Sequence, residues 1–276
     1  MAPGRWGAVV IDRRYSRQTV LDGLGEDGQA SLKTTHVVIF GLGGVGGAAA
    51  ISLAAAGVER LSLWDGDRVE LSNLHRQTLY CESDIGAWKA DCAAARIRAV
   101  NSCCEVHVHA VDATSTRLRE WEARSGEPLS LVIDATDNPV ARKLVSTFAL
   151  RQRLALISAA AIGWHGQISC YRMDLGAACD RCAIATRPHE LDHCEGAGVA
   201  GPVPAVIGGL AATAAINVRL GAADQTSTLM TWDARAQRFG TLQIPKRSAC
   251  ECALQQARLE RIDPRKNARG GADMRG

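Results

Sequence analysis

The chain has little net charge, few aromatic residues and no long apolar run. Its 276 residues carry a formal charge of +3 and are 4% aromatic. Residues 253–276 hold six basic and three acidic side chains, which accounts for the whole excess and leaves the body neutral. A neutral body makes a nucleic-acid-binding face unexpected. The longest apolar stretch, residues 203–216, is short for a bilayer span and rich in glycine and alanine, so no membrane contact is expected.

A secretion signal is also missing, because the first residues do not combine a positive start with an apolar core. We therefore expect a cytoplasmic protein, in which ten cysteines indicate metal or thiol chemistry rather than disulfides. The apolar fraction of 47% is ample for a core, and the length suits one large α/β domain. We expect a single domain over residues 15–252, preceded by a flexible lead-in (1–14) and followed by a flexible basic tail (253–276).

Residues 36–67 organise the rest of the chain. Residues 37–40 form a continuous apolar run, typical of a strand buried on both faces. A glycine turn, a helix ending near Gly57 and a second strand over 61–64 follow, and Asp65 closes that strand where a ribose hydroxyl is usually held. Such a turn lets a phosphate approach the backbone, beside the free N–H groups of the helix N-terminus. The stretch predicts a nucleotide site, with close structural packing as the alternative. The glycines of the turn are Gly41, Gly43, Gly44 and Gly46.

Apolar strands alternate with helices along the rest of the chain, which predicts a doubly wound, Rossmann-like α/β fold with a mostly parallel sheet. Short helices are expected before the first strand. Residues 166–173 and a hairpin of 228–232 with 238–244 predict an antiparallel C-terminal extension. The remaining strands are expected at 104–111, 129–133 and 154–161, and the helices at 89–100, 139–151 and 203–220.

Cationic and polar side chains follow the second strand, on the edge of the sheet where the glycine turn opens. Ligands bind at this carboxyl edge in parallel sheets. Arginine, binding bidentately, and lysine, acting as a point charge, could hold a triphosphate there. Asp134 and Asp137 reach the same edge from a later strand, and a carboxylate beside phosphates is a natural Mg²⁺ ligand. The candidates after the second strand are Asn73, Arg76, Gln77 and Lys89.

Two close cysteine pairs stand about seventy residues apart. C-x-x-C at Cys179 and Cys182 and C-x-C at Cys250 and Cys252 suggest a structural four-thiolate zinc clasp. C-x-x-C alone is also compatible with a redox pair, and C-x-C is tighter than the usual zinc spacing. The presence of a second pair favours zinc. Five other cysteines are expected to be small, buried apolar residues, namely Cys81, Cys92, Cys103, Cys104 and Cys170.

Two further residues carry little signal by themselves. Arg17 is a lone cation ahead of the nucleotide unit, and a solvated surface arginine is the ordinary interpretation. Cys194 lies on a loop rich in glycine and proline, where a surface thiol is more common than a nucleophile. Spacing alone would single out neither residue.

Several motifs nevertheless occur in one order between Arg14 and Cys252: RYSRQ, GLGGVG, DGD, LSNLHRQ, Lys89, DATDN, GQISCY, CDRC and CEGAGVAGP. Together they resemble the ThiF/MoeB/HesA family, bacterial relatives of ubiquitin-activating enzymes. The resemblance implies an ATP- and Mg²⁺-dependent adenylyltransferase acting on the C-terminal glycine of a small ubiquitin-like sulfur-carrier protein, for thiamine, molybdopterin or a related product. No rhodanese-like domain follows, so a separate sulfur donor such as a cysteine desulfurase or rhodanese is expected.

The resemblance also implies roles for single residues. Arg17 looks like the arginine that family members insert into the neighbouring protomer's ATP site, which implies a homodimer. Cys194 falls at the family's loop cysteine, which can form a covalent link to the carrier. Asp137 would bind Mg²⁺ and act in catalysis together with Arg17, Arg76, Lys89 and Cys194. The implied nucleotide-binding set is Gly41, Gly43, Gly44, Gly46, Asp65, Asp67, Asn73, Arg76, Gln77, Lys89, Asp137 and Asn138.

Two other functions remain open. A nicotinamide-dependent oxidoreductase would share the glycine turn, and binding of NAD(H) rather than ATP would identify it. A catalytically silent binding protein of the same fold would show no pyrophosphate exchange. The adenylylation chemistry suits the residue types better. A glycine carboxylate is ionised at neutral pH and needs no general base to attack the α-phosphate, whereas a dehydrogenase usually needs a proton donor that is not evident here.

Overall fold

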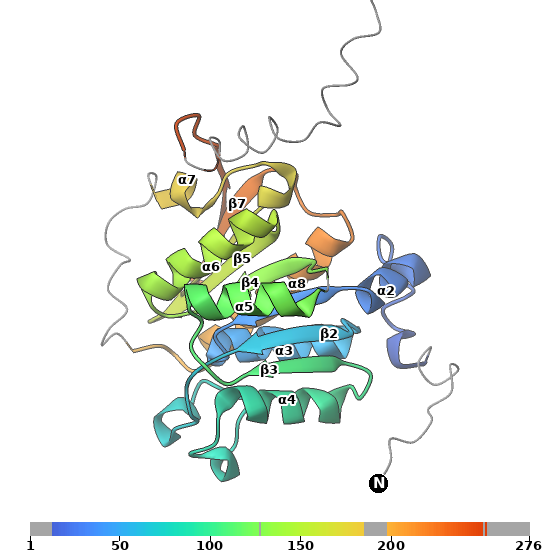
Figure 1. Cartoon of the computed structure of the whole chain (residues 1–276), viewed down its shortest axis with the longest axis vertical. Helices are drawn as coiled ribbons and strands as arrows, with labels where there is room; N and C mark the ends of the chain where they lie inside the picture. The colour runs from blue at the N-terminus through green and yellow to red at the C-terminus, as the bar shows by residue number, and fades with distance from the viewer. Residues whose placement is uncertain (1–12, 127, 185–197, 251, 253–276) are drawn as a thin grey trace, which may run out of the picture.

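The computed structural model describes residues 13–126, 128–184, 198–250 and 252. Their strands form one eight-stranded sheet in the order β3-β2-β1-β4-β5-β6-β7-β8 (Figure 1). Pairing from β3 to β5 is parallel, and the pairs β5–β6, β6–β7 and β7–β8 are antiparallel. The predicted α/β fold with its antiparallel extension is therefore confirmed. The strands are β1 (His36–Phe40), β2 (Arg60–Trp64), β3 (Glu105–His109), β4 (Leu131–Asp134), β5 (Ala155–Ile162), β6 (His165–Tyr171), β7 (Ser227–Asp233) and β8 (Arg238–Ile244).

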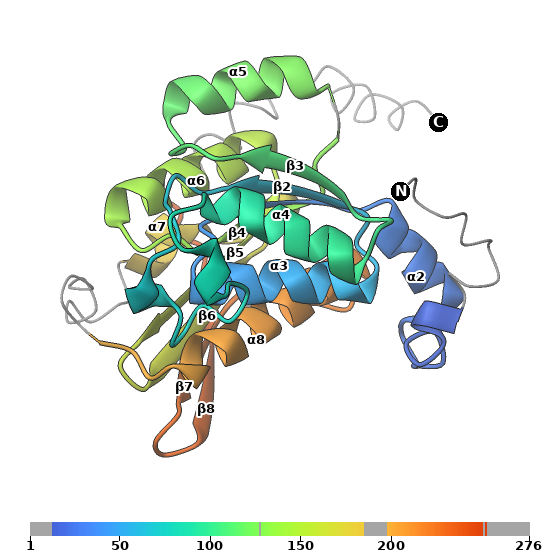
Figure 2. The same ribbon diagram turned by 90° about the horizontal axis from the view of Figure 1, so that it is seen from below.

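Helices cover both faces of the sheet (Figure 2). One face carries α3 (Gly44–Ala56), α4 (Lys89–Val100) and α8 (Pro202–Arg219). The other carries α5 (Ser115–Ser125), α6 (Pro139–Gln152) and the short α7 (Asp180–Ile184). Helix α2 (Gly25–Lys33) precedes β1, and three 3₁₀ turns lie at Leu71–Asn73, Glu82–Asp84 and Met173–Leu175.

The position of β1 at the centre of the sheet explains why its sequence is apolar. All five of its residues are buried. Val37 and Ile39 pack into the core beneath α3, α4 and α8, whereas Val38 and Phe40 pack into the core beneath α5 and α6. A strand with helices on both faces has no solvent side, and a continuous apolar run is the consequence.

Helix α5 was not expected from the sequence. Its 11 residues, STRLREWEARS, are mostly charged, and the buried apolar residues are Leu118 and Trp121. Two apolar positions are too few to reveal a helical period. The signals present were at its ends, where the Thr114 hydroxyl accepts a hydrogen bond from the Arg117 N–H at 3.2 Å and Gly126 adopts a left-handed conformation.

The length of helix α8 corrects the expectation that the apolar stretch at residues 203–216 is too short to span a bilayer. The helix has 18 residues with a mean hydropathy of 1.2, and in the described part of the chain it is the one helix long and apolar enough, by length and composition, to cross a membrane. The length of this apolar segment therefore does not by itself exclude a membrane-spanning helix. Its inner residues, including Val203, Ile207 and Ala211, are buried in the core shared with α3 and the sheet, which makes it a helix of this domain.

The prediction that the five unpaired cysteines are buried is wrong for two of them. Cys104 is buried and Cys92 and Cys170 are partly buried, but Cys81 and Cys103 are exposed. Burial raises the pKa of Cys104 to about 12 and that of Cys170 to about 11. These two thiols stay protonated at neutral pH and are poor nucleophiles.

Two partly or fully buried histidines predict acid-sensitive stability. His36, 1% exposed, lies with Nε2 2.8 Å from the Ser62 hydroxyl, and His109 stacks on Trp64. Burial lowers the pKa of each to about 4. The unfolded chain therefore binds more protons than the folded chain between about pH 6.5 and 4, so stability falls as the pH drops through that window.

For His36 alone the expected loss between pH 7 and 5 is about 2 kcal/mol. Urea unfolding at both pH values measures it. Because other groups also titrate between these pH values, the unmodified chain is compared with His36→Gln. The free energy of unfolding of this variant should fall by about 2 kcal/mol less between pH 7 and 5 than that of the unmodified chain. The exposed His75 serves as the control position, because His75→Gln should behave like the unmodified chain. Equal acid sensitivity in all three proteins would contradict the prediction.

Candidate functional site

The glycine turn joins the carboxyl end of β1 to α3 and needs glycine at two positions. Gly41 has φ +82°, and a Cβ there would lie 2.6 Å from the Ala135 carbonyl oxygen. A Cβ on Gly46 would lie 1.8 Å from the Gly41 carbonyl oxygen. Side chains at these positions would force the turn open. The turn is therefore folded tightly against the end of β4.

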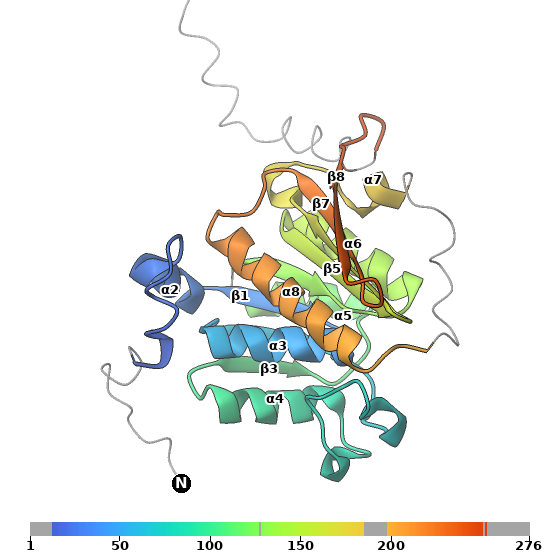
Figure 3. The same ribbon diagram turned by 180° about the vertical axis from the view of Figure 1, so that it is seen from behind.

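The N-terminus of α3 is open to a ligand. Its N-cap residue is Gly43, and no side chain caps the helix. The first N–H groups of a helix lack partners within the helix and carry its positive dipole end, so they favour an anion. Figure 3 shows this end of α3 beside the start of α8. The packing is close, because a Cβ on Gly44 would lie 2.7 Å from the Pro204 side chain.

Asp65 fastens the turn to the end of β2. Its carboxylate accepts hydrogen bonds from the Leu42 N–H at 2.6 Å and from the Asp67 N–H at 2.8 Å. Burial raises the pKa of Asp65, although these two hydrogen bonds act to lower it. Each carboxylate oxygen still has a lone pair, so a held Asp65 can accept a further bond from a ligand hydroxyl.

Lys89 is buried beside this turn. It is 6% exposed, and its ammonium lies 2.8 Å from the Asp67 carboxylate, whose side chain is 67% exposed. The Lys89 N–H also donates to the Asp67 carbonyl at 3.0 Å. Asp67 therefore positions Lys89 in this structure, a link that the sequence did not reveal.

Arg68 and Trp88 contact each other at the start of α4, the helix whose first residue is Lys89. The Arg68 guanidinium carbon lies 3.8 Å from the centre of the Trp88 ring, and its Nη1 donates to the Gly86 carbonyl at 2.6 Å. The two residues also form an antiparallel bridge. Stacking of arginine on tryptophan fixes the start of α4. Only the tertiary contact identifies these positioning residues.

The residues after β2 reach the turn in different ways. The Asn73 Oδ1 accepts from the Glu70 N–H at 3.3 Å, and the Arg76 guanidinium donates to the Ser72 carbonyl at 2.9 Å, so both stabilise their own loop. Gln77 is 5% exposed, and its amide nitrogen would lie 3.6 Å from a Cβ on Gly43. Its buried Oε1 has no hydrogen-bond partner among the described residues. The structure thus places Gln77 against the glycine turn, with its side-chain oxygen able to accept a further hydrogen bond.

Two carboxylates lie close together in the sequence at the end of β4, but one is buried and the other is exposed. Asp134 is 2% exposed, its pKa is raised by burial, and it accepts bonds from Thr136 and Ser158. Asp137 is exposed, and Asn138 caps α6 by accepting from the Ala141 N–H at 2.7 Å. The available carboxylate is therefore Asp137. One carboxylate at a phosphate site fits Mg²⁺, which takes its remaining ligands from phosphate and water.

Arg17 lies at the opposite end of the molecule from this turn. The neighbouring Gln18 donates to the Ala56 carbonyl at 2.8 Å, and the Tyr15 hydroxyl accepts from Asn101 at 2.9 Å. These contacts are at the C-terminal ends of α3 and α4. A helix of 13 residues is about 20 Å long, so Arg17 cannot reach the N-terminus of α3 in its own chain. Cys194 lies outside the described residues.

The two cysteine pairs meet between α7 and the segment after β8. All four sulfur atoms lie within 4.8 Å of one another, and the residues are buried. The Sγ···Sγ distances are 4.0 Å for Cys179–Cys182, 3.6 Å for Cys179–Cys250 and 3.7 Å for Cys182–Cys252. These are too long for disulfides. The predicted meeting of the pairs is confirmed.

The cluster fits a zinc ion. Four sulfurs around zinc at about 2.3 Å would be separated by about 3.8 Å along each tetrahedral edge. Burial raises the pKa of Cys179 and, to about 11, that of Cys252, so without a cation these thiols keep their protons at neutral pH. A bound metal would hold them as thiolates. That the cluster holds zinc stays a prediction.

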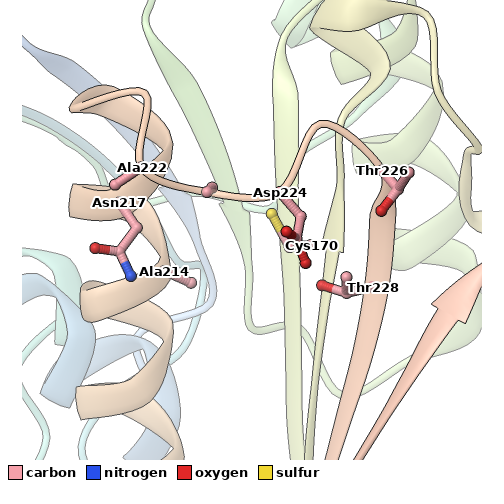
Figure 4. Close-up of a pocket in the computed structure, with 8 residues that line it drawn as sticks. Cys170, Ala214, Asn217, Ala222, Asp224, Thr226 and Thr228 are labelled. Atoms are coloured by element: carbon pink, nitrogen blue, oxygen red, sulfur yellow. The ribbon is translucent and has the colours of Figure 1, made fainter.

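A separate pocket of about 270 Å³ lies between the end of α8 and strands β6 and β7 (Figure 4). Polar groups of Asn217, Asp224, Thr226 and Thr228 line it together with Cys170. It includes the C-terminal end of α8, whereas Pro204 at the start of that helix packs on the glycine turn. The pocket is therefore distinct from the turn.

A family model described as the ThiF family matches residues 15–254. Among curated proteins, a sulfur carrier protein adenylyltransferase of Thermus thermophilus is 35% identical over 268 residues, covering 94% of this chain and 97% of that protein. Adenylyltransferase and sulfurtransferase MOCS3 of Aedes aegypti is 33% identical over 253 residues and covers 90% of this chain but 57% of that protein. The chain thus spans about half the length of the MOCS3 relatives it matches.

Solved structures share the fold at lower identity. PaaA matches with a TM-score of 0.71 and 23% identity, covering 88% of this chain and 86% of that chain. Escherichia coli MccB with ATP matches with a TM-score of 0.67 and 20% identity, covering 87% of this chain and 74% of that chain. At this identity the likeness describes the arrangement of strands and helices alone.

Proposed function

Because the chain belongs to the ThiF family, we propose that it adenylylates the C-terminal glycine of a ubiquitin-like sulfur-carrier protein at the expense of ATP. The observation that supports this most directly is the meeting of the open α3 N-terminus, Asp65 and Lys89 at the carboxyl edge of the sheet. Together they suit a nucleotide with its phosphates on the helix and its ribose on Asp65. The sulfur-carrier substrate is supported by the name of the Thermus relative, which this chain covers almost completely.

The proposed reaction needs positioning and charge neutralisation. A carboxylate oxygen of the carrier attacks the α-phosphorus of ATP, the bond to the β-phosphate oxygen breaks, and acyl adenylate and pyrophosphate result. No proton has to move, because the carboxylate is ionised at neutral pH. Lys89 and Arg76 would stabilise charge developing on the pyrophosphate, and Gln77 would donate to a phosphate near Gly43. A bound Mg²⁺ at Asp137 would further neutralise the phosphates.

The remaining parts of the proposal are finer. We propose that the protein acts as a cytoplasmic homodimer, that one domain spans residues 15–252, and that Cys194 can link covalently to the carrier. The four-cysteine cluster would hold zinc as a structural site, since four thiolates leave no open position for catalysis. The sulfur product, whether thiamine, molybdopterin or another, depends on the carrier, and the sulfur would come from a separate donor protein.

ATP–pyrophosphate exchange measured with a panel of purified sulfur-carrier proteins tests the function. We expect exchange that depends on one or more carriers and is lost when the carrier's last glycine is removed. Calorimetry should show binding of Mg-ATP. Binding of NAD(H) without ATP would instead identify an oxidoreductase, and ATP binding without exchange with any carrier would identify a silent binding protein.

Asp137→Ala is expected to reduce exchange by about 10²–10³-fold, because it removes the exposed carboxylate proposed to bind Mg²⁺. The fold should be retained, since Asp137 is exposed. The rate should recover in part when Mn²⁺ or excess Mg²⁺ compensates for weaker binding. Glu120→Ala, at an exposed acid on α5 outside the site, is the control for exchange. Full activity of Asp137→Ala at limiting Mg²⁺ would show that the metal assignment is wrong.

Hybrid dimers should show that Arg17 acts across the interface. Arg17→Ala and Lys89→Ala are each expected to be inactive. In a random mixture half of the dimers are hybrids, and one site of each hybrid keeps both residues, so activity should return to about a quarter of the unmodified level. Recovery is measured after subunit exchange verified with two affinity tags. Hybrids that form and stay inactive would rule out action in trans.

A further inference from the structure

Asp134 is a buried acid at the end of an apolar strand. Residues 131–133 before it are buried and apolar, and Asp134 itself is 2% exposed. A buried carboxylate is unfavourable unless its oxygens are hydrogen-bonded. Burial raises the pKa of Asp134, whereas the charge of Arg142 and hydrogen bonds from Thr136 and Ser158 act to lower it. The partners of this carboxylate therefore indicate why an acid stands here.

The two oxygens of Asp134 bind different segments of the chain. Oδ1 accepts from the Thr136 N–H at 3.1 Å and from the Thr136 hydroxyl at 2.7 Å. Oδ2 accepts from the Ser158 hydroxyl at 3.2 Å. Ser158 belongs to the neighbouring strand β5 and lies in register with Asp134. The carboxylate therefore joins the loop after β4 to the adjacent strand.

Arg142 holds the same threonine from α6. Its Nε and Nη2 donate to the Thr136 carbonyl oxygen at 3.1 Å and 2.9 Å. The N–H, hydroxyl and carbonyl groups of Thr136 are thus all hydrogen-bonded. Asn138, two residues further on, caps α6 through the Ala141 N–H at 2.7 Å. The exposed Asp137 stands between these two residues, so the backbone that carries it is held on both sides.

The same loop packs against the glycine turn. The Ala135 N–H donates to the Phe40 carbonyl at 2.8 Å. A Cβ on Gly41 would lie 2.6 Å from the Ala135 carbonyl oxygen and 3.1 Å from the Thr136 nitrogen. A Cβ on Gly46 would lie 3.1 Å from the Ala135 Cβ. The loop is therefore fixed relative to the turn at which the proposed function places the phosphates.

We propose that Asp134 is a positioning residue, which acts through Thr136 to hold the Asp137 carboxylate where it can bind Mg²⁺ at the phosphates of ATP. The inference rests on the proposed function for the nucleotide and the metal. Groups that hydrogen-bond to a metal ligand orient it and tune the affinity of the site. Here the orientation passes through the backbone, because Thr136 is bonded and Asp137 follows it directly. Ser158 holds the carboxylate of Asp134 from the sheet.

The size of the effect follows from the hydrogen bonds removed. Loss of a group that orients a ligand typically weakens metal binding by about 10–100-fold. Asp134→Asn keeps the side-chain size but leaves one acceptor oxygen, and we expect a loss within this range. Thr136→Val removes one hydroxyl and should weaken binding by about 10-fold. Ser158→Ala should act in the same direction with a smaller effect, because its bond of 3.2 Å is the longest of the three.

The experiment measures Mn²⁺ binding by electron paramagnetic resonance in the presence of α,β-methylene-ATP. Mn²⁺ takes the same oxygen ligands as Mg²⁺, and this analogue cannot be cleaved between its α- and β-phosphates. The variants should bind Mn²⁺ more weakly, although their affinity for the analogue without metal and their circular dichroism stay unchanged. Pyrophosphate exchange should recover largely at saturating Mg²⁺. A purely structural role for Asp134 would lower stability without this selective loss of metal affinity.

Two further variants serve as controls. Ser169 is the register partner of Ser158 on β6, 1% exposed, and its hydroxyl has no hydrogen-bond partner among the described residues. Ser169→Ala makes the same chemical change on the same face of the sheet and should leave Mn²⁺ affinity unchanged. Thr136→Ser keeps the hydroxyl and should bind Mn²⁺ nearly as well as the unmodified chain. If Asp134→Asn fails to fold, Thr136→Val and Ser158→Ala decide.

The outcomes separate this inference from the proposed function. Folded Asp134→Asn and Thr136→Val proteins that bind Mn²⁺ as tightly as the unmodified chain would overturn the positioning role. It would also be overturned if Asp137→Ala left Mn²⁺ affinity unchanged, or if the unmodified chain bound no Mn²⁺ with the nucleotide analogue. Weakened Mn²⁺ binding in the variants, together with no exchange between the unmodified chain and any carrier, would contradict the proposed function and support the positioning role.

Discussion

Replacing Lys89 with methionine should reduce pyrophosphate exchange by about 10²–10³-fold without unfolding the protein. The ammonium is a buried cation at the turn, 6% exposed, and it pairs with Asp67. The stacking of Arg68 on Trp88 fixes the start of the helix that carries it. A preorganised charge of this kind stabilises the pyrophosphate as it leaves, and it needs no rearrangement at the moment of reaction. Methionine keeps most of the side-chain volume and removes only the charge.

The stability cost of Lys89→Met should be small, because its partner Asp67 is 67% exposed and stays hydrated when unpaired. Steady-state exchange and thermal unfolding measured side by side separate the two effects. Arg96→Met provides the control, since it removes an exposed cation from the same helix, and it should retain full activity. A loss of activity matched by a similar loss of folded protein would attribute the effect to the fold.

Replacing Cys250 with serine should remove zinc and lower the midpoint of thermal unfolding by about 10 °C, equivalent to a few kcal/mol for a domain of this size. Cys250 lies 3.6 Å from Cys179, in a cluster that ties the segment after β8 to α7. The other three cysteines cannot complete a closed four-thiolate site. Metal analysis and differential scanning calorimetry measure the two losses, which should occur together.

Cys103→Ser is the matched control, because Cys103 is exposed and lies outside the cluster. It should keep both the metal and the unfolding midpoint. Thiol labelling of the native chain adds a second test, in which the exposed Cys81 and Cys103 should react rapidly and the four clustered cysteines slowly. If reduced protein carries no zinc and the clustered thiols react as fast as Cys103, the zinc clasp does not exist.

The sequence was sufficient for the parts of this protein that local patterns specify. The apolar run at β1, the glycines at 41 and 46 and the acid at 65 each follow from requirements of the backbone or the immediate neighbours. A strand between two layers must be apolar, and a turn with φ +82° favours glycine. The order of motifs then indicated the family, which the match over residues 15–254 established.

The tertiary structure decided what depends on distant contacts. Helix α5 buries only two apolar residues and therefore carries little periodic signal. The exposure of Cys81 and Cys103 depends on how other segments pack around them, which the residue type does not specify. The pairing of Lys89 with Asp67 joins residues 22 positions apart, and the cysteine cluster joins residues about 70 apart. No local pattern encodes such contacts, because they depend on how the strands are ordered in the sheet and on which segments this order brings together.

The position of Arg17 shows the difference most clearly. From the sequence it was one basic residue ahead of a nucleotide unit, and only the resemblance to the family implied a role at a partner's site. The structure places it at the far end of α3, about 20 Å from the turn. The sequence determined which residues are present, whereas the rigid helix between them determined that a single chain cannot bring these two together.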